Sequence, residues 1–408
     1  MKRGIHFLLV PTVAWVVGVT ATSVVGQKNY PPGITETEIK IGQTMPYSGP
    51  ASAWGTIGLA ETALFKMIND QGGIHGRKIN LITLDDAFSP PKTVEQTRRL
   101  VEDDDVAVIF GSVGLGNIAV RRYLNDRRIP QLFVLGPPQQ LDDPLHFPWT
   151  IGIQPTFYLD GLIHARHILA QRSDARIGIL YENDDYGKEH VRGFKAGLGD
   201  KAVKLIIKEL PYEISDPTVD SQIVALKDLG VDTFYNVAAP KFAAQAIRKA
   251  GELGWKPLQF LTYTSQSISA VLEPAGLQNS IGIISATAAK DPSDTRWKDD
   301  PYTKEFLDWK RRYYPSGSAT DIFILAGYFF SQPLIYVLKQ CGDDLSRERI
   351  MYEATHLHDV AVPGLLPGIT LNTSPTDYQP IKGLRETRFN GKTWELLNAE
   401  NEGPTTPK

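Results

Sequence analysis

The sequence predicts an α/β protein made of two similar lobes, and three observations lead to this fold class. Ile39 to Asp86 reads as an apolar strand, a turn, a helix with apolar spacing and a second strand. The same alternation restarts after Thr156. The chain has 408 residues, of which 42% are hydrophobic, enough to bury two cores. Because strand-helix-strand units join parallel strands, each lobe should hold a parallel sheet covered by helices.

The first unit places polar and aromatic residues directly after a strand. Residues 39–44 form the strand, residues 46–50 carry turn chemistry, and Ile57, Leu64 and Ile68 recur at helical spacing. Ligands of open α/β sheets bind outside the carboxyl ends of the strands, so Ser48 and Trp54 should lie at a binding edge. The spacing alone leaves open that they only shape a turn.

Two further strands of the first half each end in a glycine-containing loop. Residues 106–110 lead into Gly111 to Asn117, and residues 131–135 lead into Gly136 to Pro138. The stretch from Gly114 to Ala119 matches a dinucleotide fingerprint, but no acidic residue ends a strand about twenty positions later. The glycines are instead expected to expose backbone N–H groups at a helix start, where they can hold a carboxylate.

The second half repeats the alternation and is followed by a helical region. Strands are expected at 176–181, 203–210, 233–237, 259–262 and 281–285, with helices at 159–170, 188–198, 219–229 and 242–253 between them. Helices at 302–314, 320–340 and 346–356 should cover the first sheet, and short strands are expected at 386–389 and 393–397.

The composition and the first residues indicate where the protein is located and which partners it has. Lys2 and Arg3 precede an apolar stretch to Val25, which indicates an export signal cut after Gly26, although its length also fits a membrane anchor. The other apolar run, residues 322–338, should be a buried core helix. A net charge of -3 gives no reason to expect nucleic acid as a partner. We expect a periplasmic protein with no stable membrane insertion once the signal is removed.

Catalytic and metal-binding patterns are absent from the sequence. His164 and His167 share a helical face, but without a third ligand they are expected to be surface histidines rather than a metal site. Asp85-Asp86 and Asp184-Asp185 should cap loops, because adjacent residues at a strand end point to opposite sides. No nucleophile is paired with a base. The sequence therefore predicts a protein that is no enzyme and needs no cofactor.

Several short motifs together resemble one known family. They are Pro46-x-Ser48-Gly49-Pro50, Trp54-Gly55, Ile68-Asn69-x-x-Gly72-Gly73-Ile74-x-Gly76-Arg77, Asp85-Asp86 and Asp185-Tyr186-Gly187. The mature chain resembles, over nearly its whole length, the periplasmic substrate-binding proteins of ABC transporters of the leucine/isoleucine/valine-binding type.

The resemblance implies the type I periplasmic binding protein fold, with two Rossmann-like lobes joined by three hinge crossings. The crossings would fall near Gln154, residues 286–291 and residues 357–362. The implied parts are a signal peptide at 1–26, an N-terminal lobe of 34–153 plus 290–357, a C-terminal lobe of 154–289 plus 358–398, and a polar tail at 399–408.

The resemblance also implies a ligand site between the lobes. The family's carboxylate-holding loops match the regions of Gly114 and Gly136, but its hydroxyl residue is replaced by Pro138. Tyr186 would close over the ligand, and Trp54 would line the side-chain pocket. The expected ligand contacts are Ser48, Trp54, Gly114, Leu115, Gly116, Asn117, Gly136, Pro138, Gln154, Tyr158, Tyr186, Asn236, Thr264 and Ser265.

The function implied is capture of a small carboxylate-bearing solute and its delivery to the permease subunits of an ABC importer. Residues 261–266, where the family places an acid for an amino acid's ammonium group, carry none. An unpaired buried ammonium is costly, so an aromatic or branched organic acid fits better than a branched-chain amino acid. A secreted α/β hydrolase and a sensory ligand-binding module are the alternatives.

Overall fold

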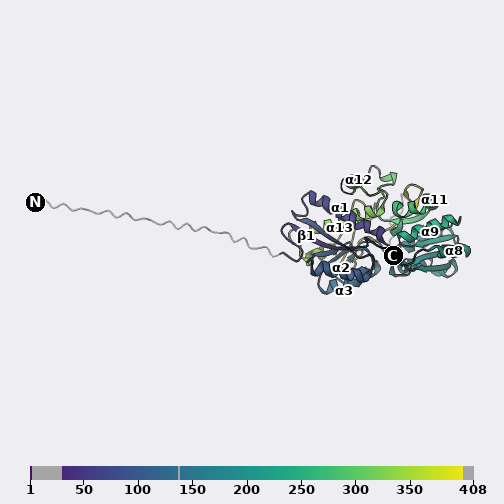
Figure 1. Cartoon of the computed structure of the whole chain (residues 1–408), viewed down its shortest axis with the longest axis horizontal. Coiled ribbons are helices and arrows are strands. Elements are labelled where there is room, and N and C mark those ends of the chain that lie inside the picture. The colour runs from purple at the N-terminus through teal and green to yellow at the C-terminus, as the bar shows by residue number, and fades with distance from the viewer. Residues whose placement is uncertain (2–29, 137, 398–408) are drawn as a thin grey trace.

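The computed structural model describes residues 30–136 and 138–397, together with Met1. The predicted signal peptide, apart from Met1, and the predicted tail at 399–408 lie outside the described residues. The chain forms two sheets, one of five strands and one of seven, each flanked by helices. Figure 1 shows the two lobes side by side, the first carrying α1, α2 and α3 and the second carrying α8 and α9.

The first sheet is parallel throughout, with the order β2-β1-β3-β4-β5. Its strands are β1 (Glu38–Met45), β2 (Lys78–Asp85), β3 (Val108–Phe110), β4 (Gln131–Val134) and β5 (Thr150–Gly152). The strand order reverses at β1, which lies between β2 and β3. The loops after β1 and β3 therefore open onto the crevice where such sheets bind ligands.

The second sheet has the order β12-β11-β10-β9-β8-β6-β7. Its strands are β6 (Ile177–Glu182), β7 (Ile206–Tyr212), β8 (Thr233–Val237), β9 (Leu258–Leu261), β10 (Ile284–Thr287), β11 (Arg385–Phe389) and β12 (Trp394–Leu396). Only the pairs formed by β11 are antiparallel. The order reverses at β6, so the loops after β6, β8 and β9 lie at the second crevice.

Helices of the first lobe come from two distant parts of the chain. They are α1 (Gly55–Asp70), α2 (Pro90–Glu102), α3 (Gly116–Asp126), α4 (Pro138–Leu141), α12 (Pro301–Tyr313), α13 (Ile322–Gln340) and α14 (Arg347–Ala354). The late helices do cover the first sheet, as predicted: α13 packs on α1 and contacts β4. The approach is close, because a Cβ on Gly327 would lie 2.4 Å from the Ile57 carbonyl oxygen.

Among the described residues, α13 is the one helix long and apolar enough to cross a membrane by length and composition. Two thirds of its apolar stretch, 67%, is buried inside the protein. Side chains such as Leu334 and Leu338 are fully buried. It therefore has the burial of a core helix, as the sequence predicted.

Helices of the second lobe follow the strands of its sheet. They are α5 (Phe157–Gln171), α6 (Asp185–Leu198), α7 (Ala202–Leu205), α8 (Asp220–Asp228), α9 (Pro240–Glu252), α10 (Glu273–Ala275) and α11 (Leu277–Ser280). Helices α5 and α6 pack with their backbones nearly touching. A Cβ on Gly193 would lie 2.0 Å from the Tyr158 carbonyl oxygen, and one on Gly161 would lie 2.2 Å from the His190 carbonyl oxygen.

Three sequence predictions differ from the structure. Residues 203–205, expected in a strand, belong to α7, and Val203 is 94% exposed. Strand β5 was not predicted, because its three residues are too few to show a period. The strand expected at 281–285 begins at Ile284, since Gly282 has a φ of 88° and Ile281 is exposed.

The passages between the lobes lie close to one another. Residues 153–156 connect β5 to α5. Ala289 pairs with Leu365, which brings the segments expected to hold the second and third crossings together. The chain then returns to the first lobe, where the Tyr378 N–H donates to Asp142 at 2.7 Å, before it enters β11. The exact lobe limits stay a prediction.

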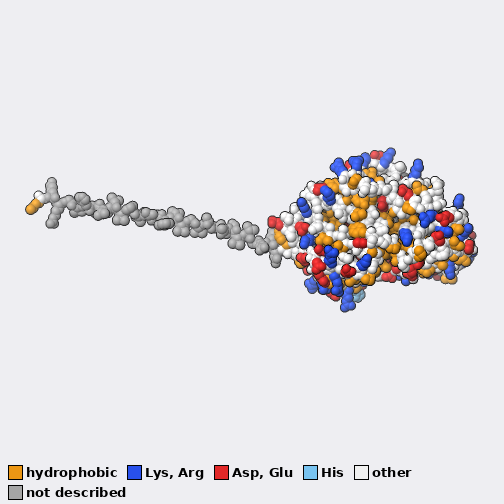
Figure 2. Space-filling view, viewed as in Figure 1, with side chains coloured by type: hydrophobic (Ala, Val, Ile, Leu, Met, Phe, Trp, Pro, Cys, Tyr) orange, Lys and Arg blue, Asp and Glu red, His pale blue; other side chains and the backbone are white. Residues whose placement is uncertain are grey.

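The surface is mixed in charge on the face shown in Figure 2. Lysine, arginine, aspartate and glutamate side chains are interspersed there, with apolar side chains between them. This distribution accords with the small net charge of -3.

The contact of α5 with α6 predicts that Gly193→Ala destabilises the protein. Alanine normally favours a helix interior over glycine by about 1 kcal/mol. Here the added methyl group meets the Tyr158 carbonyl, so we expect a loss of about 1 to 3 kcal/mol in the free energy of unfolding. Urea denaturation measures it, with the exposed Lys188→Ala in the same helix as the control. A gain in stability for Gly193→Ala would contradict the packing described.

Candidate functional site

A cavity of about 130 Å³ lies between the lobes, at the carboxyl ends of both sheets. Its wall is mostly aromatic and aliphatic, with glutamine, threonine and tyrosine side chains as the polar exceptions. No Asp, Glu, Lys, Arg or His is among the described residues that line it. Any recognition of charge at this site must therefore come from backbone groups, hydroxyls or amides, or from charges behind the wall.

Trp54 enters the cavity from the loop after β1 and reaches the opposite lobe. Its indole N–H donates to the Thr264 carbonyl oxygen at 3.2 Å. Its ring lies edge-on to Tyr186, with 6.3 Å between the ring centroids and 69° between the planes. The two rings therefore contact each other directly. At this separation no ligand ring fits between Trp54 and Tyr186.

Phe88 is a wall residue that the sequence analysis missed, and its backbone is unusual. Ala87 and Phe88 have φ angles of 50° and 60°, in the left-handed region that bulky residues rarely adopt. The Asp85 carboxylate accepts from the Ala87 N–H at 3.0 Å, and the Asp86 carboxylate accepts from the Phe88 N–H at 2.9 Å. The adjacent acids thus cap this loop, as predicted, and hold the Phe88 ring 5.4 Å from that of Trp54.

The loops after β3 and β4 lie side by side and are held together by Asn117. Its side-chain amide donates to the carbonyl oxygens of Ser112 at 2.8 Å and Gly114 at 3.0 Å, with Leu135 at 3.3 Å. Gly114 lines the cavity and has a φ of 107°. A Cβ there would lie 2.6 Å from the Phe88 ring, so only glycine fits.

Helix α3 begins at this edge of the cavity. Its first residue is Gly116, and its N-cap, Leu115, provides no side-chain cap. The first turn of a helix carries partial positive charge, although here the N–H groups of Asn117 and Ile118 already donate to the Gly114 and Leu115 carbonyl oxygens at 3.3 and 3.0 Å. Leu115 itself lines the cavity. This end of the wall can accept an anionic or carbonyl oxygen.

Tyr186 and Thr264 form the polar part of the wall in the second lobe. Tyr186 lies in the first turn of α6, which Asp184 caps by accepting from the Gly187 N–H at 3.0 Å. The Tyr186 hydroxyl is 2.8 Å from the Thr264 hydroxyl. Burial raises the pKa of Tyr186 well above its usual range, so this hydroxyl keeps its proton.

The structure brings together half of the residues predicted as ligand contacts. Those that line the cavity are Trp54, Gly114, Leu115, Gly136, Gln154, Tyr186 and Thr264. Of the others, Ser48, Gly116, Asn117, Tyr158, Asn236 and Ser265 lie outside the wall, and the side chain of Pro138 is not among those that the structure describes. As ligand contacts, all fourteen residues stay predictions.

Several residues outside the wall have structural partners instead. The Ser48 hydroxyl donates to Asp85 at 2.6 Å, and that of Ser265 donates to the Ala238 carbonyl at 2.6 Å. The Asn236 amide donates to the Ala243 carbonyl at 3.4 Å. The Tyr158 N–H donates to Glu189 at 3.2 Å. Gly116 packs against Thr93, and Pro138 opens α4. These residues support the loops on which the wall residues lie.

Much of the wall comes from helix α13, which the sequence analysis assigned only to covering the first sheet. The wall residues of this helix are Ile322, Phe323, Leu325, Ala326, Phe329 and Phe330. The sequence did indicate that this helix has more than one buried face, because its first half is apolar around its whole circumference. One face of such a helix can cover the sheet while another faces a cavity.

A buried charged cluster lies in the second lobe behind the cavity. Asp160 and His164 are fully buried on α5, with 3.3 Å between the Asp160 carboxylate and the His164 Nε2. The Glu386 carboxylate on β11 accepts from His164 at 3.0 Å and from His167 at 2.6 Å. The expectation that His164 and His167 are surface residues was wrong, because β11 covers this face of α5. Among the described residues, no group of His, Cys, Asp and Glu is arranged to hold a metal ion.

The cluster shifts the pKa values of its members in opposite directions. Burial by itself lowers the pKa of His164, but the Asp160 charge and the hydrogen bonds to Asp160 and Glu386 raise it to about 9. Burial by itself raises the pKa of Asp160, but His164 and His190 lower it well below its usual range. Both groups are therefore charged at neutral pH.

The raised pKa of His164 predicts that stability falls in alkaline solution. Its contribution is full below the unfolded-state pKa of about 6.5 and is lost as the pH rises through the folded-state pKa of about 9. We expect the free energy of unfolding to fall by on the order of 3 kcal/mol between about pH 6 and about pH 9. Urea denaturation at the two pH values measures it.

Two variants separate this contribution from other titrations. His164→Gln should be less stable at the lower pH and should lose most of the pH dependence. His146→Gln, which changes an exposed histidine that is paired with Asp143, should keep it. If the free energy of unfolding fell equally with pH in the wild type and in His164→Gln, the pH dependence would not come from His164.

Comparison with known proteins gives one family for most of the chain. The family model described as "Periplasmic binding protein" matches residues 38–393. Leu/Ile/Val-binding protein homolog 7 of Brucella abortus (strain 2308) is 23% identical over 229 residues, which span 54% of this chain and 57% of that protein. Homolog 1 of Brucella suis biovar 1 (strain 1330) is 24% identical over 336 residues, 78% of this chain and 82% of that protein.

Solved structures share the fold at low sequence identity. A branched chain amino acid ABC transporter protein from Thermus thermophilus with bound valine has a TM-score of 0.80 and 15% identity, covering 92% of this chain and 98% of that one. A solute binding protein of an ABC transporter from R. palustris in complex with benzoate has a TM-score of 0.76 and 19% identity, covering 91% and 97%. The chain therefore belongs to the periplasmic binding protein family and shares the fold of these solved structures.

Proposed function

We propose that this protein captures a small aromatic or branched organic acid in the cavity between its lobes and delivers it to an ABC importer. The observation that carries the proposal is the wall itself. Residues of both lobes line the cavity, its side chains are mostly apolar, and no charged side chain is among them. Such a site favours a compact apolar body with one polar group.

The size of the cavity supports a ligand of this kind. At about 130 Å³ it is close to the engineered apolar cavity of about 150 Å³ that binds benzene. Phe88, Phe157 and Phe329 supply aromatic surface, and each aromatic contact contributes on the order of 1 kcal/mol beyond area burial. A single ring or a branched chain of similar volume is the body that fits.

The polar part of the ligand is proposed to lie between α3 and Tyr186. The start of α3 contributes the positive end of its helix dipole, and the Tyr186 and Thr264 hydroxyls lie on the opposite lobe. These groups suit a carboxylate. They provide no counter-charge for an ammonium group, and an isolated buried charge costs several kcal/mol.

The two structural neighbours represent the alternatives for the ligand. The R. palustris protein holds benzoate, an aromatic acid, and the T. thermophilus protein holds valine, a branched-chain amino acid. The uncharged wall of this chain favours the first kind of ligand. An amino acid would need a carboxylate that the described wall residues do not supply.

The family also supports a location and a set of partners for this protein. The family implies an extracytoplasmic place. We propose export through the signal at residues 1–26 and docking on the permease subunits of an importer. For the hydrolase alternative, no nucleophile with a neighbouring base is found among the described residues of the cavity wall.

The uncharged wall predicts that organic acids bind more tightly than the amino acids of the same shape. Calorimetric titration of 3-phenylpropanoate against phenylalanine, and of 4-methylpentanoate against leucine, tests this directly. We expect at least about a tenfold lower Kd for each acid, because the ammonium group stays unpaired. Tighter binding of either amino acid would show that a carboxylate reaches the ligand and would refute the proposed ligand class.

The position of Trp54 in the wall predicts that its removal weakens ligand binding. Trp54→Ala removes both the ring that faces the cavity and the N–H that bonds the other lobe, so we expect a loss of about 2 kcal/mol or more in binding free energy. The loss should be larger for 3-phenylpropanoate than for a smaller acid such as propanoate. Trp54→Phe keeps a ring without the N–H and separates the two effects. Unchanged affinity in both variants would place the ligand elsewhere.

A further inference from the structure

His190 lies directly behind the cavity wall without being part of it. It is fully buried on α6, one turn after Tyr186. Its ring stacks on that of Phe157, with 4.7 Å between centroids and 14° between planes, and meets the Tyr186 ring edge-on at 4.7 Å. Both of those neighbours line the cavity. A charge on His190 would therefore act on a ligand through one layer of aromatic side chains.

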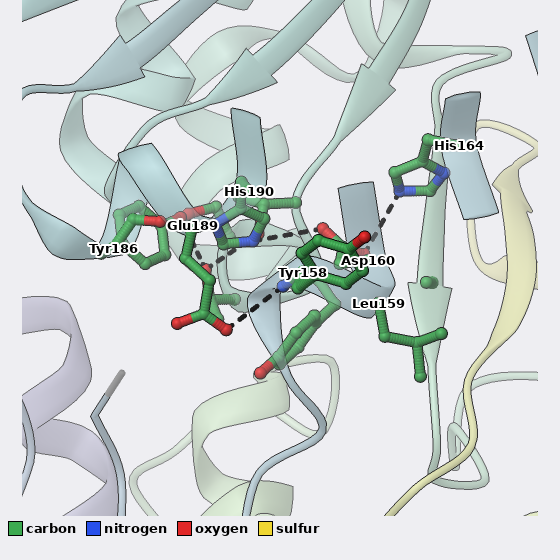
Figure 3. Close-up of polar contacts among 12 residues, drawn as sticks. Tyr158, Leu159, Asp160, His164, Tyr186, Glu189 and His190 are labelled. Atoms are coloured by element: carbon green, nitrogen blue, oxygen red, sulfur yellow. Dashed lines mark hydrogen bonds and ion pairs between the residues drawn. The ribbon is translucent and has the colours of Figure 1, made fainter. Parts of the chain in front are cut away.

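Each ring nitrogen of His190 faces an oxygen that can only accept a hydrogen bond. Nδ1 lies 2.9 Å from the Tyr186 carbonyl oxygen, and Nε2 lies 3.3 Å from a carboxylate oxygen of Asp160. Figure 3 shows His190 and His164 on either side of Asp160. A proton on each nitrogen lets both of these oxygens accept a hydrogen bond and gives the Asp160 carboxylate a second cationic neighbour; a neutral ring would instead need the Thr262 hydroxyl, 2.8 Å away, to donate to Nε2. We take the protonated form of the ring, which is a cation.

Asp160 has the surroundings of an ionised partner. Besides His190, its carboxylate receives the Tyr235 hydroxyl at 3.2 Å and lies 3.3 Å from His164. His164 is itself protonated, as its contacts with Asp160 and Glu386 require. With His190 protonated, one carboxylate lies between two imidazolium rings, and Glu386 balances the cluster from the side away from the cavity. The positive charge nearest the wall is that of His190.

A row of hydroxyl groups connects His190 to the cavity. The Thr262 hydroxyl lies 2.8 Å from the His190 Nε2 and 3.2 Å from the Thr264 hydroxyl, which lies 2.8 Å from that of Tyr186. If Nε2 donates to Thr262, the Thr262 proton is free to be donated to Thr264, and that of Thr264 to Tyr186. The Tyr186 proton then remains free for a ligand.

The opposite protonation would reverse the row. A neutral His190 with its proton on Nδ1 would accept from Thr262 at Nε2. Thr264 would then donate to Thr262, and Tyr186 would donate to Thr264. The cavity would be offered only a lone pair of the Tyr186 oxygen, which repels a carboxylate.

We propose that His190 is a positioning residue that makes this cavity select a carboxylate over a neutral ligand of the same shape. Its two N–H groups orient the hydroxyl row so that Tyr186 donates into the cavity, and its charge lies behind the wall that the ligand touches. The inference rests on the proposed function and names the residue that would give an uncharged wall its preference for an anion.

The protonation of His190 can be observed without any ligand. Nitrogen-15 NMR of the histidine side chains at neutral pH, with His190→Gln used to assign the signals, distinguishes the imidazolium from the neutral forms. We expect both nitrogens of His190 to show the shifts of protonated nitrogens. A neutral ring in the wild-type protein would overturn the proposal.

The preference itself is measured with benzoate and benzamide, which share a shape and differ in charge. The wild type should bind benzoate more tightly. His190→Gln, which removes the charge, should lower the affinity for benzoate about tenfold or more while changing that for benzamide by less than about twofold. Thr262→Val has nearly the same shape, interrupts the row and keeps the charge, so part of the preference should be lost.

A second histidine variant serves as the control for these measurements. His167→Gln changes a histidine of the same cluster that contacts Glu386 and not the hydroxyl row, so it should keep the preference. Equal weakening of both ligands in His190→Gln and Thr262→Val would show a merely structural role and overturn the proposal. If His190→Gln does not fold, Thr262→Val decides. A wild-type protein that binds neither ligand nor any other organic acid would instead refute the proposed function, and this inference with it.

Discussion

A buried hydrogen bond from the Trp54 indole to the Thr264 carbonyl joins the two lobes at the cavity, and the arrangement of the site depends on it. Thr264 also bonds Tyr186 through its hydroxyl. Nearby, the Ser267 hydroxyl donates to the Asp321 carboxylate at the start of α13. The groups that hold the lobes together are thus neighbours of those that form the wall. Whatever occupies the cavity must fit the space that this contact leaves.

The wall of the first lobe is held in place by residues that do not themselves line it. Asn117 ties the loops after β3 and β4 through their carbonyl groups. Asp85 and Asp86 hold the left-handed backbone that projects Phe88 towards Trp54. Such strain persists only where surrounding bonds oppose it, and here it places an aromatic ring in the cavity. A site made largely of apolar contacts thereby keeps a defined shape.

Buried charge in the second lobe stands in contrast to the uncharged wall. Taking ions out of water is costly, and the arrangement around Asp160 offsets that cost by pairing the carboxylate with His164 and His190 and with the Tyr235 hydroxyl. Placing the charge behind aromatic side chains leaves the wall dry and apolar. Its field still acts across a short distance, because the medium between has low polarisability.

The sequence by itself determined the fold class, the two parallel sheets and most of their strands, because hydrophobic periodicity reports local structure. It also placed Trp54 and Gly114 at the cavity, since the ends of parallel strands meet at one edge, and the family resemblance added Tyr186. Only the tertiary structure decided that Trp54 contacts Tyr186, that α13 lines the cavity and that His164 is buried. Segments far apart in the chain make these contacts, as Trp54 and Thr264 do, and local spacing carries no information about which side chains packing will bring together.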